Sequence, residues 1–364
     1  MDDDLRYQLL PQRLLPWFRD NARDLPWRQD REPYHVWLSE IMLQQTRVET
    51  VKGYYTRFLA ALPTVEDLAA APVEQVQKLW EGLGYYSRAQ NLQKAARVIA
   101  ERYGGSFPDT YEQLLDLPGI GAYTAGAIAS ICFELPTPAV DGNVLRVIAR
   151  LTGLDDCVDE PKVKTAVGER LKAVYPTGAC GAFTQSLMEL GAVVCVPNGE
   201  PICDQCPVAD LCAARLEGRI REFPIKAEKR ARREEELTVF LIRSTDGRIA
   251  IRRRPEEGLL AGLWELPHED GFLDETAALE AVRMLGCEPK ELIRQLRRRH
   301  IFTHVTWQMR CYELLCRSCG ELIWASPEDL QSAYALPTAF RQFLEMQYNA
   351  SRSGGVFMLP GSRR

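Results

Sequence analysis

Apolar residues recur with helical spacing from residue 5 to about residue 220 and with strand-like spacing after that point. The helical pattern is clearest at residues 34–43, 76–83, 92–99, 125–131 and 144–151. Breaks that contain proline or glycine separate these stretches, and the most pronounced is Leu117-Pro-Gly-Ile-Gly121. This part of the chain is therefore predicted to be all-helical.

The pattern changes near residue 221. The charged run at 226–236 is typical of an exposed linker. Residues 237–244 and 249–252 are strand-like and flank the turn Thr245-Asp-Gly-Arg248, residues 276–285 show helical spacing, and further strands are expected around 300–315. We therefore expect a helical domain at 1–222, a linker at 223–236, an α+β domain at 237–347 and a flexible tail at 348–364.

Length, charge and cysteine content limit the possible functions. A chain of 364 residues suits two domains, and no apolar run approaches the length of a membrane span. The 11 cysteines are an odd number in a long chain whose charged start has no signal sequence, so we expect free thiols and an intracellular protein that does not contact membranes. The net charge of −5 does not favour binding to nucleic acid. Basic clusters such as Arg297-Arg-Arg299 nevertheless leave DNA binding open.

A glycine hairpin opens one of the predicted helices. Gly119 and Gly121 permit positive φ and close backbone approach, and the free N–H groups at the start of the next helix can hold a phosphate. Such contacts fix a duplex in register without reading its sequence. The alternative is an ordinary turn, since a Gly-x-Gly pair alone is weak evidence.

Four cysteines form a compact group with the spacing C-x7-C-x2-C-x5-C, namely Cys195, Cys203, Cys206 and Cys212. Four thiolates suit tetrahedral zinc, and they equally suit a [4Fe–4S] cluster. The chemistry of the residues alone leaves both metals open.

Two acidic residues are candidates for glycosidic bond cleavage, which needs a paired acid and carboxylate. Glu40 lies in an apolar stretch where burial would raise its pKa and make it a general acid, although helical periodicity alone favours a position facing water. Asp141 and Asn143 precede a helix, where one of them is expected to act as the N-cap. The segments 24–28 and 81–88 mix aromatic residues, glycine and arginine, which suits either a surface for DNA or a core.

Taken together, these segments resemble the MutY family of adenine DNA glycosylases. The matching segments follow in order along nearly the whole chain, at 24–28, 39–49, 80–88, 117–127, 139–146, the cysteine loop, 263–267 and 302–307. The resemblance implies an all-α helix-hairpin-helix glycosylase domain with an iron–sulfur cluster loop, followed by an α+β Nudix-like domain. It favours a [4Fe–4S] cluster over zinc, although the first cysteine spacing is one residue longer than the commonest spacing in the family.

The resemblance also implies roles for single residues. Glu40 would protonate adenine at N7, and Asp141 would stabilise the oxocarbenium-like sugar. Tyr123 and Asn143 would complete the sugar side of the pocket and place the water. The remaining expected contacts are Trp27, Arg28 and Gln185 around the flipped adenine, Gln45 and Tyr85 in the base stack, and Gly119 and Gly121 at a phosphate.

The second domain resembles a Nudix fold through Gly262-Leu-Trp-Glu-Leu-Pro267, but residues 278–286 lack the magnesium-binding Nudix helix, so hydrolase activity is not expected. In the family this domain recognises 8-oxoguanine through a Phe-Ser-His-like loop. Here the loop reads Phe302-Thr-His304, so Thr303 and His304 are the expected contacts. The expected partner is double-stranded DNA with 8-oxoguanine·A or G·A mispairs, bound by a monomer in a bacterial-type cytoplasm, at the nucleoid.

Three alternatives stay open. An endonuclease III-like glycosylase/lyase shares the hairpin, aspartate and cysteines, but it carries a lysine where this chain has Tyr123, which cannot form a Schiff base. A glycosylase for G·T mismatches is disfavoured by Glu40 and by the second domain. A non-catalytic DNA-binding or redox-sensing protein is disfavoured by the presence of both carboxylates.

Overall fold

The computed structural model describes residues 2–228 and 231–344, and the predicted tail at 348–364 lies outside the described residues. The chain forms two compact units. The helical unit comprises Met1–Val73 and Ser87–Lys229, and the sheet unit comprises Glu74–Tyr86 and Arg230–Arg364. The segment Glu74–Tyr86 thus belongs to the sheet unit, although it lies within the predicted helical domain in the sequence.

The helical unit has no strand among its described residues, which confirms the all-helical prediction. Its elements, together with α5 (Val73–Trp80) at the boundary, are α1 (Asp3–Asn21), η1 (Pro26–Arg28), α2 (Pro33–Leu43), α3 (Val48–Ala61), α4 (Val65–Ala70), α6 (Ser87–Tyr103), α7 (Tyr111–Leu115), α8 (Ala122–Phe133), α9 (Gly142–Thr152), α10 (Pro161–Lys172), α11 (Cys180–Val193), η2 (Cys203–Gln205), α12 (Ala213–Leu216) and η3 (Ile220–Glu222). None of the helices in the described part of the chain is long and apolar enough to cross a membrane.

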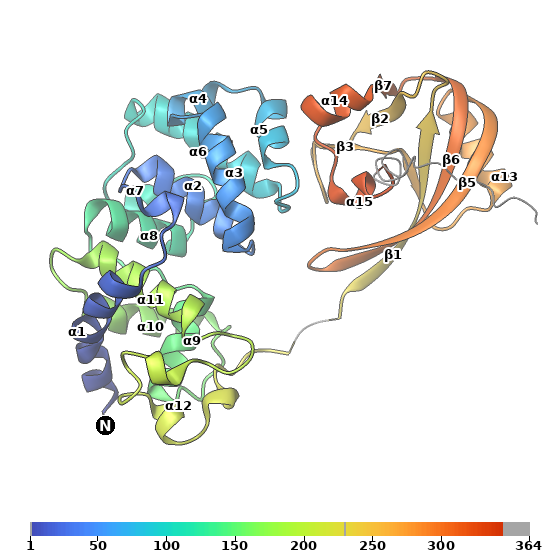
Figure 1. Ribbon diagram of the computed structural model, residues 1–364. Coiled ribbons are helices and arrows are strands. Elements are labelled where there is room, and N and C mark those ends of the chain that lie inside the picture. The colour runs from blue at the N-terminus through green and yellow to red at the C-terminus, as the bar shows by residue number, and fades with distance from the viewer. Residues whose placement is uncertain (1, 229–230, 345–364) are drawn as a thin grey trace, which may run out of the picture. The chain divides into compact units, whose positions relative to one another are not determined.

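Helix α11 packs against α1, α8 and α9, and this packing positions the segment that carries Asp141 (Figure 1). Two glycines allow the close approach. A Cβ added at Gly126 on α8 would lie 2.3 Å from the carbonyl oxygen of Pro138, and one at Gly191 on α11 would lie 2.6 Å from Cβ of Asn143. Residues 138–143 are therefore held closely between two helices before α9 begins.

The sheet unit is built on β1 (Arg233–Arg243), which pairs in parallel with β6 (Val305–Cys319). The strand order is β3-β2-β1-β6-β5, and β4 and β7 pair with β1 and β2. The other elements are β2 (Ile249–Arg253), β3 (Trp264–Glu265), β4 (His268–Asp270), α13 (Glu275–Met284), β5 (Cys287–Ile301), β7 (Ile323–Ala325), α14 (Pro327–Ser332) and α15 (Thr338–Arg341).

The two faces of this sheet bury separate cores, which explains why β1 is buried continuously from Leu237 to Arg243. Val239 and Leu241 point to the core beneath α15, whereas Phe240 and Ile242 point to the core beneath α13. The prediction of an α+β second part is confirmed.

Candidate active site

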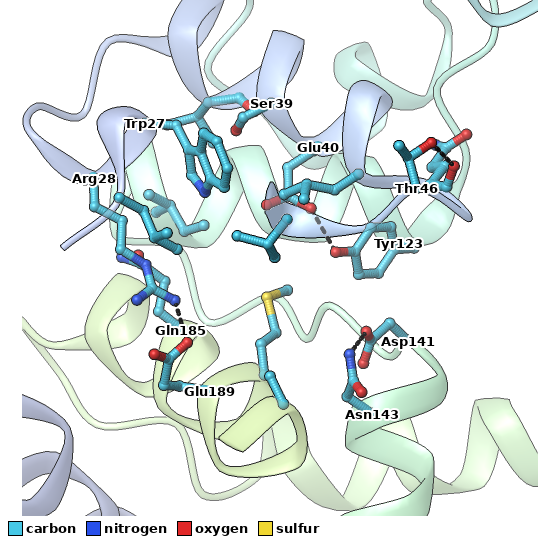
Figure 2. Close-up of a pocket in the computed structure, with 18 of the residues that line it drawn as sticks. Trp27, Arg28, Ser39, Glu40, Thr46, Tyr123, Asp141, Asn143, Gln185 and Glu189 are labelled. Atoms are coloured by element: carbon cyan, nitrogen blue, oxygen red, sulfur yellow. Dashed lines mark hydrogen bonds and ion pairs between the residues drawn. The ribbon is translucent and has the colours of Figure 1, made fainter. Parts of the chain in front are cut away.

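A cavity of about 520 Å³ opens in the helical unit between η1, α2, the N-termini of α8 and α9, and α11 (Figure 2). Its volume is in the range of sites for small organic groups. Among the residues that line it are eight that the sequence predicted, namely Trp27, Arg28, Glu40, Gln45, Tyr123, Asp141, Asn143 and Gln185. Residues spread over more than 150 positions of the sequence thus meet at one cavity.

Glu40 lies on α2, a helix with buried residues on nearly every side. Its exposed fraction is 7%, so the alternative in which it faces water is wrong. The carboxylate accepts a hydrogen bond of 2.5 Å from the hydroxyl of Tyr123 on α8. Burial raises the pKa of Glu40 to about 7, with the Tyr123 hydrogen bond opposing the rise and the charge of Asp141 adding to it. Glu40 can therefore hold a proton near neutral pH.

Tyr123 keeps its own proton, because burial and the neighbouring charge of Glu40 raise its pKa well above the usual value. The phenol is thus a fixed donor that points from α8 to the carboxylate on α2 (Figure 2). It cannot serve as an amine nucleophile.

Asp141 is the N-cap of α9, and it also faces the cavity. One carboxylate oxygen accepts the backbone N–H of Val144 at 2.7 Å, and the other accepts the side-chain amide of Asn143 at 2.8 Å. Burial raises the pKa of Asp141, and these two hydrogen bonds act against the rise by favouring the ionised form. Capping and a position in the cavity are therefore compatible.

Arg146, which sequence reasoning missed, fixes the amide of Asn143. Its guanidinium donates to Oδ1 of Asn143 at 2.8 Å, to the carbonyl of Gly191 at 2.7 Å and to the carbonyl of Cys195 at 2.7 Å. Only 5% of Arg146 is exposed. A chain of hydrogen bonds thus joins Asp141 to the first cysteine of the predicted metal loop.

The other end of the cavity holds Trp27, Arg28 and Gln185 (Figure 2). Arg28 donates to Oε2 of Glu189 at 2.8 Å, and Arg23 donates to Glu189 through its backbone N–H at 2.9 Å and through its side chain at 2.7 and 2.8 Å. Burial alone would raise the pKa of Glu189, but the hydrogen bonds from Arg23 and Arg28 outweigh it and lower the pKa to about 2. Neither Arg23 nor Glu189 was predicted, because a charge pair 166 positions apart leaves no local pattern.

At the hairpin where a phosphate site is predicted, the two glycines differ in backbone conformation. Gly119 has φ 75°, which favours glycine. Gly121 has φ −99° and is the N-cap of α8, so the expectation of positive φ is wrong at this residue. Both Gly121 and Ala122 are exposed, which leaves the N-terminal N–H groups of α8 open to an anion.

The two residues predicted to enter the base stack share an unusual backbone conformation. Gln45 in the helical unit has φ 57°, and Tyr85 in the sheet unit has φ 47°. Non-glycine residues adopt this left-handed region rarely, and such positions cluster at functional sites.

The four predicted metal ligands lie in the segment between α11 and α12, where Cys203 begins η2 and Cys212 is the N-cap of α12. Burial raises the pKa of the Cys206 thiol to about 12, and the neighbouring Cys195, Cys212 and Cys203 add to the rise. Arg150 donates to Sγ of Cys195 at 3.2 Å. Within residues 2–228 and 231–344, no three side chains converge as metal ligands, so the structure provides a thiol-rich loop rather than a formed metal site.

Thr303 and His304 lie in the exposed turn between β5 and β6. Within the sheet unit, the Thr303 hydroxyl lies 2.8 Å from the hydroxyl of Tyr85. Tyr85, which is predicted to enter the base stack, and Thr303, which is predicted to contact 8-oxoguanine, are therefore hydrogen-bonded to each other.

Comparisons with known proteins find two different families in the two parts of the chain. Residues 38–173 match the family model of the HhH-GPD superfamily base excision DNA repair protein, and residues 238–346 match that of the NUDIX domain. The chain is 37% identical to the adenine DNA glycosylase of Mus musculus, over 94% of this chain and 78% of that protein. It is 35% identical to that of Homo sapiens, over 96% and 75%, and 34% identical to one from Buchnera aphidicola, over 71% and 74%.

Solved structures are similar to the helical part. A thermostable thymine-DNA glycosylase aligns with a TM-score of 0.54 and 30% identity, over 58% of this chain and 98% of that one. Endonuclease III in a non-covalent DNA complex aligns with a TM-score of 0.51 and 25% identity, over 61% and 99%.

Proposed function

The chain belongs to the adenine DNA glycosylases of base excision repair, and from that premise we propose that it removes adenine paired with 8-oxoguanine or guanine in duplex DNA. The observation that carries the proposal is Glu40, a buried acid whose pKa is raised to about 7 and which faces Asp141 across a cavity of base size. Both carboxylates that glycosidic cleavage needs thus lie at one cavity.

In the proposed reaction, an adenine turned out of the duplex enters the cavity. Glu40 donates its proton to the base, which then leaves as a neutral group. Asp141 accepts two hydrogen bonds that favour its ionised form, and in that form it stabilises the positive charge that develops on the sugar. Tyr123 holds Glu40 in place, and Asn143 holds Asp141 and helps to place the attacking water.

The reaction stops at base removal, because Tyr123 stands where a lyase needs a lysine. The endonuclease III-like and thymine-removing alternatives are less well supported. Those structures match 61% and 58% of this chain, whereas two adenine DNA glycosylases match 94% and 96%.

The proposal includes recognition of 8-oxoguanine by the sheet unit. Tyr85, Thr303 and His304 support it, since they lie together near one exposed turn of that unit. Thr303 keeps the hydroxyl of the family's serine and adds a methyl group. We expect T303A and H304A to reduce the preference for 8-oxoguanine·A over G·A while leaving cleavage itself intact. An unchanged preference would place recognition elsewhere.

A [4Fe–4S] cluster is the proposed cofactor, held by Cys195, Cys203, Cys206 and Cys212. The donor types fit, because this loop supplies four free thiols and the guanidinium of Arg150 donates to Sγ of Cys195. When bound, the cluster would brace this loop. Iron analysis and visible absorbance of anaerobically purified protein test this, and stoichiometric zinc in place of iron would contradict it.

The activity test uses a duplex with a single 8-oxoguanine·A pair. The wild-type chain should leave an alkali-labile break at the adenine, and D141N should leave none. Borohydride trapping as strong as that of a lyase, or tight binding with no cleavage, would contradict the proposed function. We also propose that the chain is a monomer, which light scattering tests. We place it in the cytoplasm at the DNA, which cell fractionation tests.

A further inference from the structure

Glu189 is an acidic residue in the wall of the cavity whose role is not explained by the two carboxylates of the reaction. Its side chain is completely buried, with an exposed fraction of 0%. A buried carboxylate persists only when it is paired and hydrogen-bonded. Here four hydrogen bonds satisfy it, three from Arg23 and one from Arg28.

Arg28 is the partner that lies at the cavity. Its guanidinium donates to Glu189 and, at 3.1 Å, to the carbonyl of Arg23, and it lies over the ring of Phe18 at 5.4 Å. Among the described residues, these bonds occupy two of the five N–H groups that a guanidinium carries. The side chain lines the cavity beside Trp27 and Gln185, so its remaining N–H groups are available to a base.

Arg23 holds the opposite side of the same carboxylate. Its side chain meets Glu189 through two parallel N–H···O bonds of 2.7 and 2.8 Å, the arrangement that gives the most rigid arginine–carboxylate pair. The backbone N–H of Arg23 adds a third bond, which ties the segment before η1 to α11. Glu189 is therefore fixed from one side and can fix Arg28 on the other.

We propose that Glu189 is a positioning residue, which orients the guanidinium of Arg28 toward the adenine in the cavity and uses Arg23 as its anchor. This inference rests on the proposed function for the identity of the base. By this inference, α11 helps to orient the base toward Glu40, and it does so through Arg28.

The charges of Arg23, Arg28 and Glu189 predict a second effect of removing Glu189, on the pH dependence of cleavage. Two arginines and one glutamate give a net charge of +1 at this wall. E189Q would raise it to +2, and Arg28 already lowers the pKa of Glu40. The other titratable groups near Glu40 are Tyr123, Asp141 and Cys132, and E189Q changes none of them. Loss of Glu189 should therefore move the pH dependence of cleavage to lower pH.

The test is single-turnover cleavage of the 8-oxoguanine·A duplex at saturating enzyme, which gives a rate constant independent of the active fraction. We expect E189Q to slow this step about tenfold, because misplacement of a positioning group acts on the chemical step. Duplex affinity should change less than about twofold. E189D keeps the charge and should retain the wild-type pH profile. E101Q, an exposed glutamate on α6, is the matched control.

A double-mutant cycle separates positioning from bracing. If Glu189 acts through Arg28, E189Q should slow R28A far less than it slows the wild type. Coupling to R23A with none to R28A would mean that Glu189 only braces the fold, and this would overturn the inference. An unaltered rate constant in E189Q would overturn it as well. A wild-type chain that leaves adenine uncut would overturn the proposed function, and this inference with it.

Discussion

At the residue scale, the burial of Glu40 serves the proposed reaction and opposes the stability of the fold. Its pKa, raised by burial to about 7, keeps a proton available for the leaving base. The same shift means that the folded protein binds more protons than the unfolded chain between about pH 4.5 and pH 7. Stability should therefore fall as pH rises through this window.

The first prediction concerns Glu40. Single-turnover cleavage should be fastest below the pKa of Glu40 and should fall about tenfold for each pH unit above it. E40Q should lose about 100-fold or more of the rate. It should also gain stability over the wild type by on the order of 3 kcal/mol between pH 5 and pH 8, measured by urea denaturation. A wild-type rate in E40Q, or parallel stability curves for the two proteins, would contradict the assignment.

The second prediction concerns Arg146, which joins Asn143 to the cysteine loop. R146A leaves the amide of Asn143 and the carbonyls of Gly191 and Cys195 without their donor, and unpaired buried groups cost about 1–3 kcal/mol each. We expect lower stability and a single-turnover rate reduced about tenfold. R146K should recover part of the stability and little of the rate, because an ammonium cannot reproduce the fork of a guanidinium. Lower stability with a wild-type rate would show that the link does not act on Asp141.

At the element scale, the site depends on how closely α8 and α11 approach the segment before α9. G126A places a Cβ 2.3 Å from the carbonyl oxygen of Pro138. The contacted atoms belong to the backbone, which cannot move aside as a flexible side chain can. We expect a loss of about 2–3 kcal/mol in the free energy of unfolding.

The control for G126A is G53A on α3, where no atom lies within 4 Å of the added Cβ. There the gain in helix propensity should raise stability by about 0.5–1 kcal/mol. Chemical denaturation of the two variants should therefore give shifts of opposite sign, and equal shifts would show that α8 can move away from Pro138.

Features set by local sequence patterns could be predicted, and features set by contacts between distant residues could not. The helices, the change to strands and an N-cap at either Asp141 or Asn143 follow from local patterns, which is why they could be predicted. The burial of Glu40 could not, because α2 is buried on nearly every side and so has no polar face to compare with. The pairing of Glu189 with Arg23 and the membership of Glu74–Tyr86 in the sheet unit depend on contacts between distant positions, which no local pattern records.

At the scale of the whole molecule, a net charge of −5 has to be compatible with binding a polyanion. Uneven distribution makes this possible. β5 carries the run Arg297-Arg-Arg299 just before the turn with Thr303 and His304, and both Arg297 and Arg299 are exposed. Their place next to the proposed recognition turn suits contacts to phosphates on either side of the opposing base.

The last prediction follows from that placement. Each phosphate contact contributes about 0.9 to the slope of log affinity against log salt concentration, so R297A/R299A should reduce the slope by up to about 1.8. K290A, an exposed residue at the other end of the same strand, should leave the slope unchanged. Single-turnover cleavage at saturating enzyme should be the same in all three proteins, because the cavity lies in the helical unit. Equal slopes for R297A/R299A and the wild type would mean that β5 does not contact the DNA backbone, and that its arginines serve the sheet alone.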